Sequence, residues 1–408
     1  MGACYSKGLN ESRLLRKVFQ AHATPGGGIT SKGLMTLCAQ VNDFPMESEL
    51  ANAMVTSHGK VGSNGEDGVI SFDDFVTMLF TSEAAQFHVE KLEVLEKAED
   101  LTQPLSHYFI NSSHNTYLKG AQFASLGGAA SLEQYATVVQ HGCRCVELDC
   151  YNGDPDSKEP NEPLIYHISE SLTGGALKVA DVFSAIKRAL PKGHLPLVLN
   201  CENHMEKKSL DRFVSLAKST FGSSLLNFND MKAKSATGTL PSPEQLRGKV
   251  LLRLKPKEDP GLEKITAFRN SKLKHIQNGK QEPYESISLS APKLKKLVKV
   301  TEVMESERRS EVSSSSKSSD ESSDDELDFD DVVGAYRYTS KYVTRAYPKA
   351  TNVLSENFDP LRAWELGVEL AALNWQTPGL AMDLNNALFL RNRGVGFVLK
   401  PKWMRLRG

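Results

Sequence analysis

From residue 101 onward, short apolar runs alternate with stretches whose apolar residues recur at helical spacing. The runs predict strands over residues 107–112, 143–149, 164–168, 195–201, 250–255, 264–268, 341–346, 371–376 and 396–400. The stretches predict helices over residues 131–141, 179–190, 208–220, 292–300 and 360–370. Strands and helices in this alternation predict an α/β fold, a TIM-like (β/α)8 barrel spanning about residues 104–405.

The first four runs share a polar carboxyl end. They read HYFINSSHN (107–115), CRCVELD (143–149), LIYH (164–167) and LPLVLNCEN (195–203). Because the strands of such a barrel all end on the face that carries the active site, these polar residues are candidates for one site.

Residues 11–100 are predicted to be helical, with two loops that resemble an EF-hand pair. The twelve loop positions from Ser63 to Asp74 put Gly68 at position 6, but they place Asp74 where EF-hands have a bidentate Glu. The other loop, 22–33, has no carboxylate. We therefore expect an EF-hand-like domain with a structural role and without tight calcium binding.

Residues 305–331 form an acidic and Ser-rich insert, which we expect to be disordered because it offers little apolar surface to bury. A solvated tether, a phosphate acceptor and a lid over a basic pocket are the three roles left open for it. The expected domain boundaries are 1–10 for an N-terminal tail, 11–100 for the helical domain, 101–257 for the first half of the barrel and 262–405 for the second half.

Composition excludes several classes of protein. The 408 residues are 40% hydrophobic, enough for a large core, and the net charge of −1 gives no reason to expect nucleic acid as a partner. The six cysteines lack both zinc-finger spacing and a disulfide framework, which favours a reducing compartment. No run approaches the roughly 20 apolar residues of a transmembrane helix.

The N-terminus reads Met-Gly-Ala-Cys-Tyr-Ser and fits the acylation pattern M-G-x-x-x-[ST]. Gly2 would accept a myristoyl group, and Cys4 lies where a palmitoyl chain is often added. Because one acyl chain gives only marginal membrane binding, both are expected to contribute to a lipid anchor.

The polar strand ends have the chemistry of metal-assisted phosphoryl transfer. Four of them, Asn115, Glu147, Asp149 and Glu202, offer only oxygen donors, which suit Ca²⁺ or Mg²⁺. Glu147 and Asp149 are two apart on one strand and so point to the same face. The remaining two, His114 and His167, could neutralise a phosphate or protonate a leaving oxygen.

Several long motifs resemble eukaryotic phosphoinositide-specific phospholipase C, in a delta-like, short and N-terminally acylated form of protozoan type. The X half of that family is matched by PLSHYFINSSHNTYL (104–118), GCRCVELDCYNG (142–153), PLIYH (163–167), LNCENH (199–204) and LPSPEQLRGKVLL (240–252). The Y half is matched by YVTRAYPKATNVLSENFDPLRAWELG (342–367), ALNWQTPG (372–379) and RGVGFVLKP (393–401). No pleckstrin-homology or C2 region is expected.

The resemblance implies calcium-dependent hydrolysis of phosphatidylinositol 4,5-bisphosphate or a related lipid. Asn115, Glu147, Asp149 and Glu202 would bind Ca²⁺. His114 would stabilise the transition state, and His167 would protonate the diacylglycerol oxygen. The inositol 2-hydroxyl would attack, with Glu147 or Glu202 as base, and water would open the cyclic product.

The resemblance also implies a set of substrate contacts. Ring phosphates would meet Arg253, Lys255, Ser290 and Arg345, and the inositol ring would stack on Tyr347. Serine and threonine replace the rim aromatics usual in the family at Ser169, Ser171 and Thr351, whereas Phe123 retains one. Weak insertion into the bilayer is therefore expected.

We expect a monomer at the cytoplasmic face of a membrane, most simply the plasma membrane, held by its acyl chains. Two alternatives remain open at this stage. A glycerophosphodiester phosphodiesterase barrel uses similar acids and histidines but does not explain the basic residues from Arg253 to Arg345. A catalytically impaired phosphoinositide-binding scaffold would have lost a catalytic residue, and none is lost here.

Overall fold

The computed structural model divides into two compact units, Met1–Lys97 and Ala98–Gly408, which are described separately. The described residues are 13–42, 48–59, 68–75, 99–120, 129–167, 169–255, 259–271, 281–294, 296–297, 329–349 and 355–405. None of the helices in these ranges is long and apolar enough to cross a bilayer.

The first unit is helical, as predicted. It contains α2 (Arg13–His22), α3 (Ser31–Asn42) and α4 (Ser48–His58). Ile29 and Ile70 each donate a backbone hydrogen bond to the other across an isolated antiparallel bridge, at 2.9 Å in both directions. Residues 63–67 of the 63–74 loop lie outside the described residues, so its assignment to an EF-hand stays a prediction.

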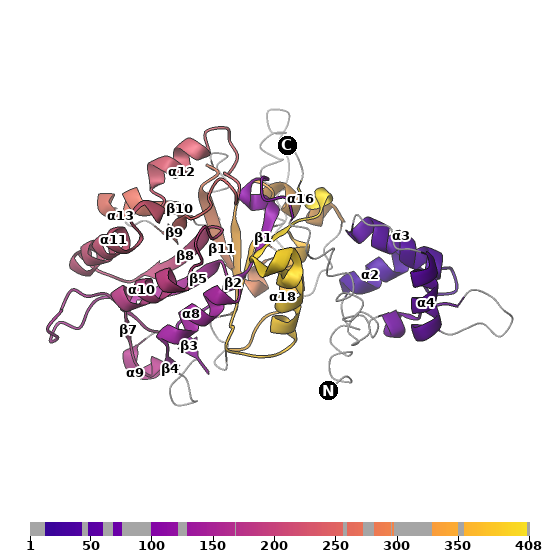
Figure 1. Cartoon of the computed structure of the whole chain (residues 1–408), viewed down its shortest axis with the longest axis horizontal. Helices are drawn as coiled ribbons and strands as arrows, with labels where there is room; N and C mark the ends of the chain where they lie inside the picture. Colours follow the sequence, from indigo (N-terminus) through magenta and orange to yellow (C-terminus); the bar gives the residue numbers. More distant parts are fainter. Residues whose placement is uncertain are drawn as a thin grey trace, which may run out of the picture. The chain divides into compact units, whose positions relative to one another are not determined.

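The second unit is a closed parallel barrel (Figure 1), and the predicted fold is confirmed. Its ring runs in the order β2 (Ser112–Ser113), β5 (Cys145–Tyr151), β8 (Leu197–Asn203), β9 (Val250–Leu254), β10 (Thr266–Asn270), β11 (Glu285–Ser290), β12 (Thr344–Tyr347) and β13 (Leu370–Leu373). The ring closes at β2, which pairs with β13 on one side and with β5 on the other.

Helices surround the barrel. They are α8 (Leu132–Gln140), α10 (Val179–Ala189), α11 (Lys207–Phe221), α12 (Phe228–Lys234), α13 (Pro260–Ile265), α16 (Phe329–Thr339), α17 (Pro360–Glu365) and α18 (Leu380–Leu390), with the one-turn α9 (Glu170–Thr173). The start of α13 shows why the chain turns helical there. Asp259 caps Leu262 N–H, and Pro260 occupies the first turn, where no amide donor is needed.

Short elements complete the unit. The 3₁₀ turns are η1 (Leu105–His107), η3 (Gly222–Ser224), η4 (Ala291–Lys293), η5 (Arg391–Gly394) and η6 (Lys402–Met404), and the strands outside the ring are β1 (Tyr108–Ile110), β3 (Leu118–Lys119), β4 (Ala129–Ala130), β6 (Leu164–Ile165), β7 (Leu177–Lys178) and β14 (Phe397–Leu399). Helix α16 starts inside the predicted 305–331 insert, whose residues 305–328 lie outside the described residues.

Two predicted strands form but lie outside the barrel ring, and one barrel strand was not predicted. The 164–168 run is no barrel strand, because its β6 pairs antiparallel with β5 on one side and with β7 on the other. The 396–400 run forms β14, which pairs antiparallel with β1 outside the ring. The sixth barrel strand, β11, was missed, since its sequence ESISLS alternates serine with apolar residues and has little hydrophobic signal.

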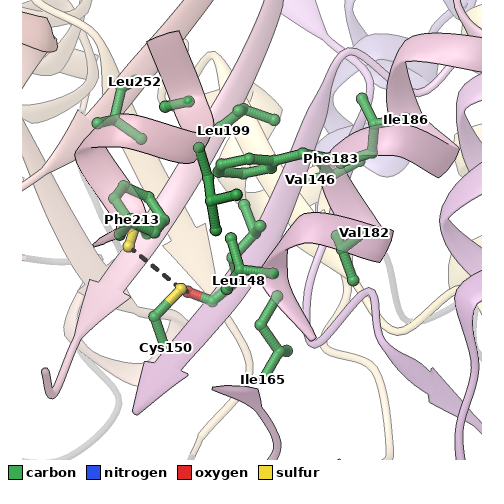
Figure 2. Close-up of a cluster of buried hydrophobic side chains, with 14 of the residues drawn as sticks. Val146, Leu148, Cys150, Ile165, Val182, Phe183, Ile186, Leu199, Phe213 and Leu252 are labelled. Atoms are coloured by element: carbon green, nitrogen blue, oxygen red, sulfur yellow. Dashed lines mark hydrogen bonds between the residues drawn. The ribbon is translucent and has the colours of Figure 1, made fainter. Parts of the chain in front are cut away.

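Period-two alternation sorts the barrel side chains into an outer and an inner set. The outward set packs against α10 and α11, where Val146, Leu148 and Leu199 meet Phe183 and Phe213 in a buried cluster (Figure 2). Each such side chain contributes about 1.5–3 kcal/mol on burial. This cluster fixes which side chains face the interior.

The inward set lies in layers, as is usual in such barrels. Cys145, Val198 and Leu251 belong to an apolar cluster at the amino ends of the strands. Two residues further along, Glu147 pairs in register with Asn200, and Asn200 with Arg253. The barrel interior is therefore apolar below and charged above, directly under the carboxyl ends.

A buried ion pair closes the opposite end of the barrel. Lys400 Nζ donates to Glu369 Oε1 and to the carbonyls of Ser106 and Thr339, at 2.6 Å and 3.0 Å for the last two. Burial raises the pKa of Glu369 to about 7 and lowers that of Lys400. Since the desolvation of both charges offsets much of their attraction, the pair serves mainly to fix where β14 joins the barrel.

Candidate active site

The carboxyl ends of the barrel strands bring together most of the predicted site residues. Glu147 and Asp149 lie on β5, Glu202 on β8 and Arg345 on β12, while His114 directly follows β2. Strands β2, β5 and β8 are neighbours in the ring, and β12 is separated from β2 by β13 alone. Because all strands of a parallel barrel end on the same face, the residues converge there.

Glu147 is the centre of the arrangement. Its Oε1 accepts from Asn200 Nδ2 at 2.9 Å and from Arg345 Nη2 at 2.6 Å, and its Oε2 accepts from the backbone N–H of Asn115 at 2.8 Å. Glu147 and Arg345 are each 1% exposed. The carboxylate is thus held rigidly by three donors from three separate strands or turns.

Asn115 adopts a left-handed backbone conformation with φ of 43°. Asparagine tolerates this region better than most residues do, which explains its place at this sharp turn. The turn aims the Asn115 N–H at Glu147 and places His114 beside it, so the two neighbours enter the site together.

His114 is enclosed on several sides. Its Nδ1 lies 2.8 Å from Asn374 Oδ1 and its Nε2 lies 3.9 Å from Glu147 Oε2. Its ring is nearly parallel to that of Tyr347, at 7° and with centroids 6.4 Å apart. Burial lowers the pKa of His114, against the opposing pull of Glu147, so the neutral ring is favoured.

Asp149 and Glu202 face each other from paired positions on β5 and β8. Asp149 Oδ2 accepts from Tyr117 Oη at 2.6 Å, whereas its buried Oδ1 has no hydrogen-bond partner. The Glu202 side chain is half exposed at the mouth. Desolvation, together with the nearby charges of Asp149 and Glu147, raises the pKa of Glu202 to about 8.

His167 reaches the site by an unexpected route. It follows β6, in the excursion beside β5, and not the end of a barrel strand. Its Nδ1 lies 3.1 Å from Tyr117 Oη and 3.7 Å from Asp149 Oδ2. The predicted strand forms but lies outside the ring, and His167 still lies close to Asp149, as predicted.

Two of the predicted ring-phosphate residues sit at different depths. Arg253 is fully buried, and its guanidinium donates to Asn200 Oδ1, Asn270 Oδ1, Ser288 Oγ and Ile287 O. Lys255, one layer higher, is exposed. The structure therefore places Arg253 within the barrel interior, and its predicted contact with substrate stays untested.

The other three predicted substrate residues lie on β11 and β12. Ser290 and Tyr347 pair in register, both partly exposed at the carboxyl ends of these strands. Arg345 lies two residues below Tyr347, with its guanidinium carbon 5.3 Å from the Tyr347 ring centre. Although burial opposes it, the attraction of Glu147 raises the pKa of Arg345, which stays charged.

Three polar residues of the site were not predicted: Tyr117, Asn200 and Asn374. Tyr117 lies three residues after His114, and Asn200 lies two before Glu202 on the same strand face, so spacing could have indicated both. Asn374 offered no such signal. The predicted acylation sites Gly2 and Cys4, and the rim residues Phe123 and Thr351, lie outside the described residues.

The oxygen donors suit a hard divalent cation. The unpartnered Asp149 Oδ1 and the raised pKa of Glu202 both show carboxylates that positive charge would stabilise. Among the described residues, however, no three His, Cys, Asp or Glu side chains are already gathered as a ready-made metal site. A cation would therefore draw these ligands together.

Family models identify the barrel. Residues 101–256 match the X domain of phosphatidylinositol-specific phospholipase C, and residues 302–403 match its Y domain. The chain belongs to the phosphatidylinositol-specific phospholipase C family. The match confirms the resemblance seen in the sequence motifs and assigns Glu147 and Asp149 to the X domain and Arg345 to the Y domain.

Individual relatives agree with this assignment. The human 1-phosphatidylinositol 4,5-bisphosphate phosphodiesterase zeta-1 is 34% identical over 355 residues, covering 82% of this chain and 55% of its own length. The delta-3-A form from Danio rerio is 35% identical over 327 residues, covering 75% and 39%. This chain thus spans about half, or less, of these relatives' length.

Solved structures show the same fold. The crystal structure of L. pealei PLC21 superposes with a TM-score of 0.60 at 23% identity, covering 97% of this chain and 51% of that one. The S. officinalis PLC21 structure gives 0.61 at the same identity. The family's barrel is therefore present here in full outline.

The electrostatics of Glu202 in this family member give a testable pH dependence. In the metal-free protein, we expect the Glu202 carboxyl to titrate near pH 8 in a carbon-13 NMR titration, its signal being assigned with Glu202→Gln. Because the folded pKa is raised, the stabilisation is fully present below the unfolded-state value of about 4.3 and is lost as pH rises through about 8. Glu202→Gln should flatten this loss, and titration at the ordinary value would contradict the account.

Proposed function

We propose that this chain is a calcium-dependent phosphoinositide phospholipase C. It would hydrolyse phosphatidylinositol 4,5-bisphosphate, or a less phosphorylated form, to diacylglycerol and inositol phosphate. One observation carries the proposal: the two histidines flank the acid cluster on one barrel face, 3.9 Å from Glu147 and 3.7 Å from Asp149. The names of the relatives, which are phosphatidylinositol 4,5-bisphosphate phosphodiesterases, support the choice of substrate.

Asn115, Glu147, Asp149 and Glu202 would hold the calcium ion. Bound there, the ion would neutralise phosphate charge and lower the pKa of the attacking inositol 2-hydroxyl. Asp149 Oδ1 has no competing partner, and Glu147 keeps lone-pair capacity on Oε2, which accepts a single hydrogen bond. Asp149 and Glu202 stand on adjacent strands in register, so both can reach one ion.

The chain's own residues divide the remaining work. Glu202 is better placed than Glu147 to take the 2-hydroxyl proton, because it is half exposed while the Glu147 oxygens already hold three donors. His114 would donate to the phosphate in the transition state, and His167 would protonate the diacylglycerol oxygen and then activate water to open the cyclic product. Tyr117 holds His167 and Asp149 in place for these steps.

The barrel mouth supplies the proposed substrate contacts. Tyr347 is partly exposed and could stack against the inositol ring. Lys255, directly after β9, and Ser290, at the end of β11, lie on either side of β10 and could meet the ring phosphates. Arg253 and Arg345 would act on these phosphates from the interior layer, chiefly through charge.

The activity can be tested with vesicles that contain phosphatidylinositol 4,5-bisphosphate. We expect calcium-dependent release of inositol trisphosphate, lost on chelation, and a fall of about 10²- to 10⁴-fold for His114→Ala and for His167→Ala. His141→Ala, which removes an exposed histidine at the end of α8, is the matched control and should retain activity. Lipid binding without release by the wild type would instead support a scaffold.

We further propose that the chain is anchored to the cytoplasmic face of the plasma membrane through myristoyl-Gly2 and palmitoyl-Cys4. The support is the sequence pattern, in which both acylation signals coincide. Ser169 and Ser171 stand where the family usually has rim aromatics, so weak insertion of side chains into the bilayer is expected. Weak insertion increases the need for an anchor.

Metabolic labelling with alkynyl fatty acids tests the anchor. The wild type should incorporate both probes and sediment with membranes. Gly2→Ala should lose myristate and shift to the soluble fraction, and Cys4→Ser should keep myristate but bind membranes more weakly, because one chain is marginal. A Gly2→Ala variant that still sediments with membranes would overturn the proposal.

A further inference from the structure

The ALNWQTPG segment, residues 372–379, is shared with the family but has no part in the chemistry described so far. It begins in β13 at the seam where the barrel closes, beside β2. Leu373 O accepts from the backbone N–H of His114 at 2.8 Å, and Trp375 Nε1 donates to Ser112 O at 3.2 Å. Through these two hydrogen bonds, the segment holds the turn that carries His114 in place.

Asn374 is the residue of this segment that reaches the His114 ring. It is 2% exposed, and its Oδ1 lies 2.8 Å from His114 Nδ1. Its Nδ2 donates to Ser355 O at 3.0 Å. The Ser355 carbonyl can only accept a hydrogen bond. If the Asn374 amide were flipped, Oδ1 would lie against this carbonyl oxygen, so Oδ1 must instead face the His114 ring.

The backbone of Asn374 is fixed as well. Its N–H donates to Asn357 Oδ1 at 2.7 Å, and its carbonyl accepts from Asn357 Nδ2 at 3.1 Å. Together with the contacts of Oδ1 and Nδ2, these hydrogen bonds fix the Asn374 carboxamide in the absence of a ligand. Such prior positioning is the property expected of a group that orients a catalytic residue.

We propose that Asn374 is the positioning residue of His114, fixing the ring in its Nδ1–H tautomer with Nε2 turned towards the reacting phosphate. The amide oxygen can only accept, so the hydrogen of the neutral ring must sit on Nδ1. In the neutral ring Nε2 therefore carries the lone pair, on the side of Glu147, from which it lies 3.9 Å. Nε2 must take up a proton, while Nδ1–H stays on Asn374, before it can donate to the phosphate. This inference rests on the proposed function for its catalytic consequence, but not for the tautomer itself.

The arrangement distinguishes Asn374 from a merely structural amide. Asn385 is equally buried and also joins the two halves of the barrel, since its Nδ2 donates to Asn111 Oδ1 at 2.9 Å. Its contacts, however, do not include His114. Asn374→Leu and Asn385→Leu each remove a buried amide that joins the two halves of the barrel. The difference between the two variants therefore isolates the effect on the His114 ring.

The test uses the full chain with imidazole nitrogens labelled, at a pH where the rings are neutral. Long-range proton–nitrogen NMR should show His114 as Nδ1–H in the wild type, in Asn385→Leu and in Asn374→Asp, whose carboxylate still accepts. Asn374→Leu should show a substantial Nε2–H population. On vesicles, Asn374→Leu should lower kcat by about 10- to 100-fold with little change in KM, because the buried Asn374 would act through the His114 ring. Asn374→Asp should recover much of that loss.

Three results would overturn the inference. The first is an Nε2–H tautomer of His114 in the wild type, a result that does not depend on whether any variant folds. Asn374→Leu could leave both tautomer and kcat as they are in Asn385→Leu. Asn374→Asp could be no better than Asn374→Leu at equal folded fraction. A wild type with the Nδ1–H tautomer but without calcium-dependent release would instead count against the proposed function alone.

Discussion

The buried ion pair between Glu147 and Arg345 is the interaction on which the site depends. Both side chains are 1% exposed, and their 2.6 Å contact lies inside the barrel, below the catalytic face. A carboxylate cannot remain charged in such a place without a partner. Arg345 and Asn200 donate to Oε1 of Glu147, and Oε2 is left to the Asn115 amide and the site above.

The pair also joins the two halves of the barrel. The predicted metal ligands and both histidines lie in the X half, whereas Arg345, Tyr347 and Asn374 lie in the Y half. Each of these three Y-half side chains holds or covers an X-half residue: Arg345 binds Glu147, and Tyr347 and Asn374 enclose the His114 ring. The predicted metal ligands and histidines thus belong to the X half, and Y-half side chains hold or cover two of these residues, Glu147 and His114.

Alternation along single strands was enough to predict part of this site. It put Glu147 and Asp149 on one face of β5, and the structure agrees. Depth was not predictable in the same way. Arg253 lies on β9 and Lys255 lies two residues further on, directly after the strand, yet Arg253 is fully buried and Lys255 is exposed. Which layer of a barrel a residue occupies depends on the stagger of its neighbours, which a single strand does not reveal.

Contacts between residues far apart in the sequence could not be predicted either. A two-residue strand such as β6 has the same sequence signal whether its neighbour is parallel or antiparallel, so His167 was placed on the ring. Asn374 meets His114 across 260 positions of sequence, and an amide at a strand end carries no chemical pattern of its own. Only the closed ring brings such residues together.

The most direct test of this account is a double-mutant cycle on the free energy of unfolding, with Glu147→Gln, Arg345→Met and the double variant. The account predicts that each single variant loses about 3–5 kcal/mol, because it leaves an uncompensated charge in the barrel. The double variant should lose clearly less than the sum, since it buries neither charge. Losses that simply add would show that the two side chains do not depend on each other, and would contradict the central role given to their contact.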